Sequence, residues 1–192
     1  ETHRTSALVE EKLKDFGCDE VVTGIGRTGV VGVIKGRGNG SGKVIGLRAD
    51  MDALPIEETG TPAWRSELSG VAHLCGHDGH MAILHAVAQG LARTPPSGRV
   101  ILLFQPAEET GAGARAVLED PRFAALGARM AISLHNLPGL PLGAVALREG
   151  PVNCASRGLR VRLSGRTAHA SQPETGQSPG VALAALIPGL AG

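Results

Sequence analysis

Apolar residues recur along the chain with the spacing of helices in four places. In residues 5–16 (TSALVEEKLKDF), Leu8, Leu13 and Phe16 can share one helical face, and Gly17 suits the position that follows a helix. Three further helices are predicted over residues 78–93, 111–120 and 178–187.

Polar residues and prolines mark where these later helices begin or end. Asp78 is a candidate N-cap for the second helix, and Pro121 ends the third. In the fourth helix, Ser178 is the expected N-cap and Pro179 occupies the first helical position.

Other apolar segments have the composition of strands, at residues 30–36, 43–50, 97–109, 129–136 and 157–165. The glycine-rich turn GRGNGSG joins the first two segments, which predicts that they pair as a hairpin. The third contains a continuous apolar run suited to burial on both faces, whereas the fifth alternates and predicts one solvated face.

Strands alternate with helices up to about residue 145, which predicts an α/β fold with a mixed sheet flanked by helices. The pattern becomes more polar near residue 155. We therefore expect one domain over residues 1–154 and the incomplete beginning of a second, α+β domain over residues 155–192.

Composition excludes several classes of partner. Nineteen Lys and Arg residues balance eighteen Asp and Glu residues, and aromatic residues are scarce, so neither nucleic acid nor a membrane surface is expected as partner. The three cysteines, Cys18, Cys75 and Cys154, are odd in number and far apart, which favours a reducing compartment such as the cytoplasm. The chain begins without Met and stops after a predicted helix, so we expect it to be a fragment.

Polar side chains of the kinds that bind metals follow three of the apolar strands. Asp50 and Asp52 follow the second strand, Glu108 and Glu109 the third, and His135 the fourth. In open α/β sheets, sites gather outside the carboxyl ends of the strands. One such carboxylate is ordinary, but three strands ending this way predict a site.

The segment HLCGHDGH (73–80) adds a Cys-x-His pair, Cys75 and His77. Taken singly, these residues are more often a buried thiol and a loop imidazole. Together they suit a divalent metal, and a helix that starts here would lower the thiol pKa and favour the thiolate. A redox role would prefer Cys-x-x-Cys, which is missing.

The pair Glu108–Glu109 either lies in a solvated loop without a role, or its two carboxylates have different roles in a site. In the second interpretation one carboxylate ligates a metal and the other is the general base for a water that the metal activates. A ligand role is the better interpretation for His135, whereas His80 and His85 either support the site or lie on the helix surface. The role of His73 stays open.

Two motifs are misleading. Residues 24–29 (GIGRTG) match the dinucleotide fingerprint, but a strand rather than a helix follows, so a tight turn is expected. Ser171 lies near His169 but lacks the G-x-S-x-G context of a serine hydrolase.

Five motifs in order resemble the amidohydrolase branch of the dinuclear metallopeptidase superfamily: LRADMDALPIEE, HLCGHDGH, LLFQPAEETGAGA, SLHNLPGLPLG and SGRTAHASQPETGQSP. The resemblance covers almost the whole chain. It implies an α/β catalytic domain with two divalent metals. Manganese or zinc is expected ahead of the alternatives cobalt and nickel. The resemblance also implies an inserted lid domain that mediates homodimer formation.

The resemblance implies a role for individual residues. It makes Glu108 the general base, Asp52 an acid that orients the metal site, and His169 a lid histidine that stabilises the oxyanion. Asp50 stands where distant relatives have a ligating histidine. The implied metal ligands are Cys75, His77, Glu109 and His135. A further ligand, a histidine near the C-terminus of the family's proteins, is expected beyond residue 192.

The implied function is metal-dependent hydrolysis of the amide bond of N-acyl amino acids or related amides. Two alternatives stay open: a metallo-exopeptidase acting on dipeptides, and a relative that binds metal without catalysis. The intact Glu108 argues against the second alternative, because a structural site has no need of a free base.

Overall fold

The computed structural model describes residues 2–37, 42–154 and 158–190 of the chain. The chain divides into two compact units, Glu1–Leu140 and Pro141–Gly192. The predicted domain boundary, after residue 154, falls at a segment outside the described residues. The assignment of residues 155–192 to a lid domain stays a prediction.

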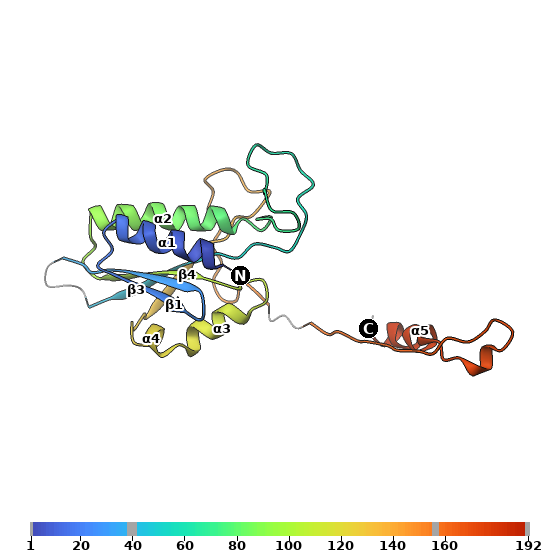
Figure 1. Ribbon diagram of the computed structural model, residues 1–192. Coiled ribbons are helices and arrows are strands. Elements are labelled where there is room, and N and C mark those ends of the chain that lie inside the picture. Colours follow the sequence, from blue (N-terminus) through green and yellow to red (C-terminus); the bar gives the residue numbers. More distant parts are fainter. Residues whose placement is uncertain (1, 38–41, 155–157, 191–192) are drawn as a thin grey trace. The chain divides into compact units, whose positions relative to one another are not determined.

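The first unit is built around a five-stranded mixed sheet in the order β1-β2-β4-β3-β5, as predicted for the fold class (Figure 1). Strand β3 runs parallel to both β4 and β5, and β2 runs antiparallel to β1 and β4. The strands are β1 (Glu20–Ile25), β2 (Gly29–Ile34), β3 (Val44–Asp50), β4 (Arg99–Gln105) and β5 (Met130–Ser133).

The predicted hairpin between residues 30–36 and 43–50 is wrong, because β4 lies between β2 and β3. Six of the seven residues of β4 are buried, so this strand belongs in the middle of the sheet with a neighbour on each side. The hairpin instead joins β1 to β2. Its turn contains Gly26 and Arg27, both at positive φ, as the tight turn predicted for residues 24–29 requires.

Helices cover both faces of this sheet (Figure 1). On one face, α1 (His3–Asp15) and α2 (His77–Arg93) pack against a cluster that includes Val100, Leu102 and Phe104 of β4. On the other, α3 (Ala112–Glu119) covers a cluster with the alternate residues Ile101 and Leu103, and the short α4 (Pro121–Ala124) follows it. Successive side chains of β4 point to opposite faces, so this one strand contributes to the core on both sides of the sheet.

The start of α2 differs from the prediction that Asp78 caps it. Gly76 is the N-cap residue, with φ 92°, and the helix begins at His77. Asp78 lies in the first turn, where its carboxylate faces the positive end of the helix dipole. The earlier start buries the His77 side chain at the helix terminus.

The second unit contains the short helix η1 (Pro173–Thr175) and α5 (Pro179–Leu190). Ser178 caps α5 as predicted, because its Oγ accepts the N–H of Gly180 at 3.2 Å. The strand predicted over residues 157–165 does not form in the described part of that range, residues 158–165. An isolated bridge pairs Arg166 with Gln177, directly after that segment. Residues 158–165 themselves pair with no strand among the described residues.

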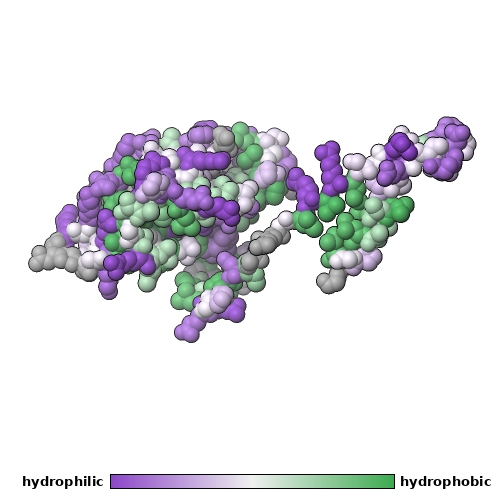
Figure 2. All heavy atoms as spheres, turned by 90° about the horizontal axis from the view of Figure 1, so that it is seen from below, coloured by the Kyte–Doolittle hydropathy of each residue, from purple (hydrophilic) through white to green (hydrophobic). Residues whose placement is uncertain are grey.

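Apolar side chains of α5 are exposed, among them Val181, Leu183, Ile187 and Leu190. Figure 2 shows this apolar surface gathered on the second unit. None of the helices in residues 2–37, 42–154 and 158–190 is long and apolar enough to cross a membrane.

Candidate metal centre

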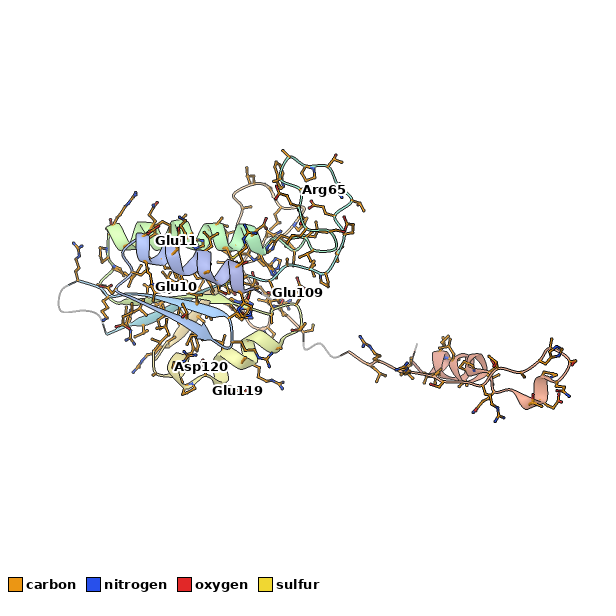
Figure 3. All side chains as sticks on the ribbon, in the orientation of Figure 1. Glu10, Glu11, Arg65, Glu109, Glu119 and Asp120 are labelled. Atoms are coloured by element: carbon orange, nitrogen blue, oxygen red, sulfur yellow. The ribbon has the colours of Figure 1, made fainter. Side chains whose placement is uncertain are left out.

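The parallel strands β3, β4 and β5 bring three loops to one edge of the sheet, because their carboxyl ends point the same way. The loop before α2 joins them there. Figure 3 labels Glu109 at this edge, beyond the end of β4. The side chains of the first unit that the sequence predicts for the site meet at this edge: Asp52, Cys75, His77, Glu108, Glu109 and His135.

His77 is the centre of this group and is fully buried. Its Nδ1 lies 2.9 Å from the backbone carbonyl of Asp52, which can only accept, so Nδ1 carries the hydrogen. In the neutral ring, the form in which histidine binds metals, the other nitrogen, Nε2, presents a lone pair. It is buried and has no hydrogen-bond partner.

Three carboxylates surround that lone pair. Nε2 of His77 lies 3.7 Å from Oδ2 of Asp50 and 3.8 Å from a carboxylate oxygen of both Glu108 and Glu109. A neutral nitrogen lone pair among negative oxygens is unfavourable in a buried place unless a cation lies between them. The donor set therefore fits a divalent metal.

Among the described residues, three groups of side chains have the spacing of metal ligands and share His77, and two of them contain the predicted ligands. One joins Cys75, His77 and His135, and the other joins His77 to Glu108 and Glu109, with all ligand atoms of a group within 4.8 Å of one another. Sγ of Cys75 lies 3.5 Å from Nε2 of His135. The structure thus brings together the four predicted ligands, and their binding of metal stays a prediction.

The Cys75 thiol differs from the expectation for a helix terminus. Burial, together with the negative charge of Glu109, raises the pKa of Cys75 above its ordinary value. Burial and the neighbouring carboxylates thus both disfavour the thiolate here. A cation at the site would reverse this balance and favour the thiolate.

Asp52 connects two parts of the site. Its carboxylate accepts the backbone N–H groups of Glu108 at 3.0 Å and Glu109 at 3.1 Å, while its carbonyl holds His77. Asp52 does not belong to any of the three candidate ligand groups among the described residues. This geometry suits the orienting role that the sequence predicts for it.

Asp50, whose role the sequence left open, is a buried carboxylate with a polar partner on each oxygen. Its Oδ2 lies 2.7 Å from Nη1 of Arg48, and its Oδ1 lies 2.7 Å from Nδ1 of His80. Burial alone would raise the pKa of Asp50, but the His80 hydrogen bond and the Arg48 charge outweigh it and lower that pKa.

Sequence reasoning missed Asn136 and Arg48. Asn136 contacts His80, and Arg48 bridges Asp50 and Gln105. A charged residue inside the apolar strand KVIGLRAD was the available signal for Arg48, since such a side chain needs a buried partner. Nothing in the sequence around Asn136 marks it.

His169 belongs to the second unit, where its Nδ1 lies 2.8 Å from Oγ of Ser171. The backbone N–H of Ser171 also donates to this nitrogen, so the contact forms a local turn. The predicted oxyanion role of His169 stays a prediction.

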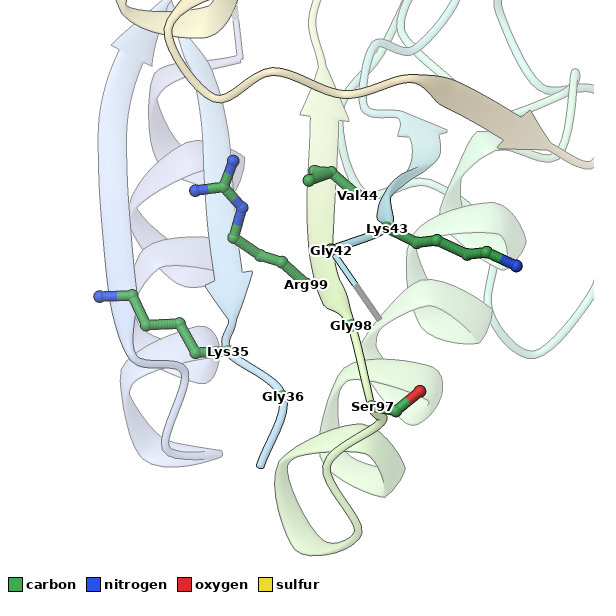
Figure 4. Close-up of a pocket in the computed structure, with 8 residues that line it drawn as sticks. All are labelled: Lys35, Gly36, Gly42, Lys43, Val44, Ser97, Gly98 and Arg99. Carbon is green, nitrogen blue, oxygen red and sulfur yellow. The ribbon is translucent and has the colours of Figure 1, made fainter. Parts of the chain in front are cut away.

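A cavity of about 220 Å³ lies at the other edge of the sheet, where β3 and β4 begin (Figure 4). Its charged residues do not converge: Lys43 points away from Lys35 and Arg99 in Figure 4. Lys35 pairs with Glu20 at 2.5 Å. This cavity offers no carboxylate, thiol or imidazole, so the candidate chemistry lies at the opposite edge.

The fold and this site together define an α/β protein with a candidate metal centre at the carboxyl edge of its parallel strands. Residues 46–186 match the peptidase family M20/M25/M40. The chain belongs to this family, which confirms the predicted resemblance.

Curated relatives include enzymes that act on acylated amino acids. The chain is 43% identical over 183 residues to hippurate hydrolase of Campylobacter jejuni, a match that covers 95% of this chain and 47% of that enzyme. It is 42% identical over 190 residues to N-acetyl-L-cysteine deacetylase of Bacillus subtilis, covering 97% and 44%. The chain therefore spans about half the length of these relatives.

A solved structure resembles the chain in the same way. A dinuclear metal-binding peptidase of the M20 family from Bacillus subtilis superposes with a TM-score of 0.72 at 37% identity. The match covers 79% of this chain and 42% of that protein.

Proposed function

We propose that the protein containing this chain hydrolyses the amide bond of N-acyl amino acids or related amides, with the help of two divalent metal ions. The observation that carries this proposal is the buried, unpartnered Nε2 of His77 among the carboxylates of Asp50, Glu108 and Glu109. The two curated relatives, a hippurate hydrolase and a deacetylase, support the substrate class.

Cys75, His77, Glu109 and His135 would hold the metals. Thiolate, imidazole and carboxylate suit zinc and manganese, and cobalt and nickel are accepted by the same donors. Bound metals of this kind polarise a carbonyl group and lower the pKa of water.

Glu108 would be the general base. Its side chain is 38% exposed, so a water and a substrate can reach it. Its carboxylate takes a proton as the water oxygen bonds to the amide carbon. The carboxyl group then returns that proton to the amine as the C–N bond breaks, so protons balance over the cycle.

Asp52 would position these groups, since its hydrogen bonds fix both the His77 ring and the backbone of the glutamate pair. We assign His169 to stabilisation of the negative charge on the substrate oxygen. We also propose a homodimer formed through the lid and a cytoplasmic location, which the three free cysteines favour.

A metallo-exopeptidase is the second candidate function, because the Bacillus subtilis structure is named a peptidase. A panel of N-acyl amino acids and dipeptides separates the two. The full-length protein is stripped of metal, reloaded separately with manganese, zinc, cobalt or nickel, and assayed on the panel. Faster turnover of acyl amino acids supports the proposal, and faster turnover of dipeptides contradicts it. Metal binding with no hydrolysis would instead identify a non-catalytic relative.

A further inference from the structure

We propose that His80 is a positioning residue that holds the ligand-bearing segments of the metal centre together, an inference that rests on the proposed function. His80 lies on α2, one turn after His77, and is 2% exposed. It is therefore not a helix-surface residue. Its two ring nitrogens contact different segments, at the ends of β3 and β5.

The contacts of His80 leave it unsuited to be a metal ligand. Asp50, His77 and His80 have ligand-like spacing within 4.8 Å. However, Nδ1 of His80 donates to Oδ1 of Asp50 at 2.7 Å, and Nε2 accepts the backbone N–H of Asn136 at 3.1 Å. Both nitrogens are thus engaged by protein groups. The same three-residue group serves as a support rather than as a separate metal site.

The Asp50 end of this support is firmly held. Arg48 contacts the second carboxylate oxygen of Asp50 at 2.7 Å and donates from Nε to Oε1 of Gln105 at 3.0 Å. The buried anion is therefore tied to both β3 and β4. A buried carboxylate with these partners gives Nδ1–H of His80 one fixed direction.

The Asn136 end reaches two sets of predicted ligands. Asn136 follows His135 directly, so fixing its backbone N–H also fixes the ligand before it. Its side chain packs on Gly76, between Cys75 and His77, so closely that a Cβ on Gly76 would lie 2.3 Å from Oδ1 of Asn136. Through Asn136, His80 thus restrains the β5 end and the loop before α2.

Removing the His80 ring nitrogens should loosen this arrangement. The loss leaves buried polar groups of Asp50 unsatisfied and frees Asn136 from α2. Partners that orient metal ligands typically contribute about 10–100-fold to metal affinity. We expect a loss of this size for His80→Phe, which keeps a ring but no hydrogen-bonding atom.

The test measures cobalt binding by the full-length protein, with absorption spectra that report the geometry around cobalt and its thiolate. His80→Phe should bind cobalt about 10–100-fold more weakly and change the spectrum. His80→Gln, whose amide can reach Asn136, should recover most of the affinity. His85→Phe is the matched control: His85 is on the same helix but packs between Phe16 and Phe104, so cobalt binding should not change.

Circular dichroism of each metal-free variant reports whether it folds. If His80→Phe does not fold, Asn136→Ala takes its place: it removes the side chain that contacts His80 and packs on Gly76, keeps the backbone N–H, and should weaken cobalt binding by a smaller factor. Unchanged cobalt affinity and spectrum in the folded variant would overturn the inference while the proposed function stands. Cobalt binding that depends on His80, without any amide hydrolysis, would overturn the proposed function and leave the inference intact. A wild-type protein that binds no metal would overturn both.

Discussion

The carboxylate of Asp52 accepts the backbone N–H of Glu108 at 3.0 Å. The next N–H, that of Glu109, donates to the other oxygen of the same carboxylate at 3.1 Å. Because the Asp52 carbonyl also holds Nδ1 of His77, a single residue orients an imidazole and two carboxylates. The proposed base and two proposed ligands thus depend on one side chain and its backbone.

Asp52→Ala should therefore lower turnover without removing any proposed ligand. The substitution leaves the N–H groups of Glu108 and Glu109 without their acceptor, so the glutamate loop loses its orientation. We expect kcat/KM of the metal-loaded, full-length protein to fall about 10–100-fold. Asp15→Ala, on the exposed end of α1, is the control and should leave kcat/KM unchanged. Equal kcat/KM for wild type and Asp52→Ala would contradict the orienting role.

The two glutamates should separate in a paired experiment. Glu108→Gln removes the proposed base, so kcat should fall about 10²–10⁴-fold while metal content stays at the wild-type value. Glu109→Gln removes a proposed ligand, so its metal content, measured by elemental analysis, should fall below the wild-type value. Metal loss in Glu108→Gln with full metal in Glu109→Gln would mean that the two roles are exchanged.

The site could be predicted from the sequence largely because parallel strands share one carboxyl edge. Asp52, Glu109 and His135 follow different strands, and the prediction needed only that those strands be parallel neighbours. The order of strands could not be obtained this way. A glycine-rich loop indicates a turn, but it does not reveal that β4 enters between β2 and β3.

Contacts across long stretches of sequence explain the remaining misses. Strand β1 was not predicted, because only one of its six residues is buried and the strand carries little apolar periodicity. The importance of Asn136 depends on Gly76 and His80, which are about sixty residues away in sequence. Residues 158–165 have the alternation of a strand, but alternation alone cannot supply the neighbouring strand they would need.

Asp120 should make the stability of the first unit depend on acid pH. Its carboxylate accepts hydrogen bonds from Arg122, whose guanidinium also donates to the carbonyls of Thr23 and Gly24 in β1. The Arg122 hydrogen bond lowers the pKa of Asp120 from 3.8 to about 2. Because the pKa of Asp120 is lower in the folded than in the unfolded chain, its ionised carboxylate stabilises the folded state at pH values above the unfolded pKa. This stabilisation is lost as the pH falls through about 2.

Asp120→Asn should therefore lower the midpoint of urea unfolding at pH 7. The difference from wild type should shrink between about pH 4 and pH 2, where wild-type Asp120 itself becomes protonated. Asp15→Asn, at the exposed end of α1, is the control for loss of one negative charge. A difference in midpoint that stays constant across this pH range would contradict the assignment to Asp120 ionisation.

Gly76 should tolerate no side chain, for two separable reasons. Its φ of 92° lies in the left-handed region, where a residue with a Cβ destabilises the folded state by about 1–2 kcal/mol. A Cβ would in addition meet Oδ1 of Asn136 at 2.3 Å. Gly17, with φ 83° and no heavy atom within 4 Å of a built Cβ, has the first problem without the second.

Comparing Gly76→Ala with Gly17→Ala therefore separates a general loss of stability from an effect at the metal centre. Both variants should lose stability, measured as the midpoint of urea unfolding of the metal-free protein. Only Gly76→Ala should also weaken cobalt binding, because the methyl group must push Asn136, and with it His135, away from the loop that carries Cys75 and His77. If Gly17→Ala weakened cobalt binding as much, the general loss of stability would account for the effect, and no special role of Gly76 in the metal centre would be needed.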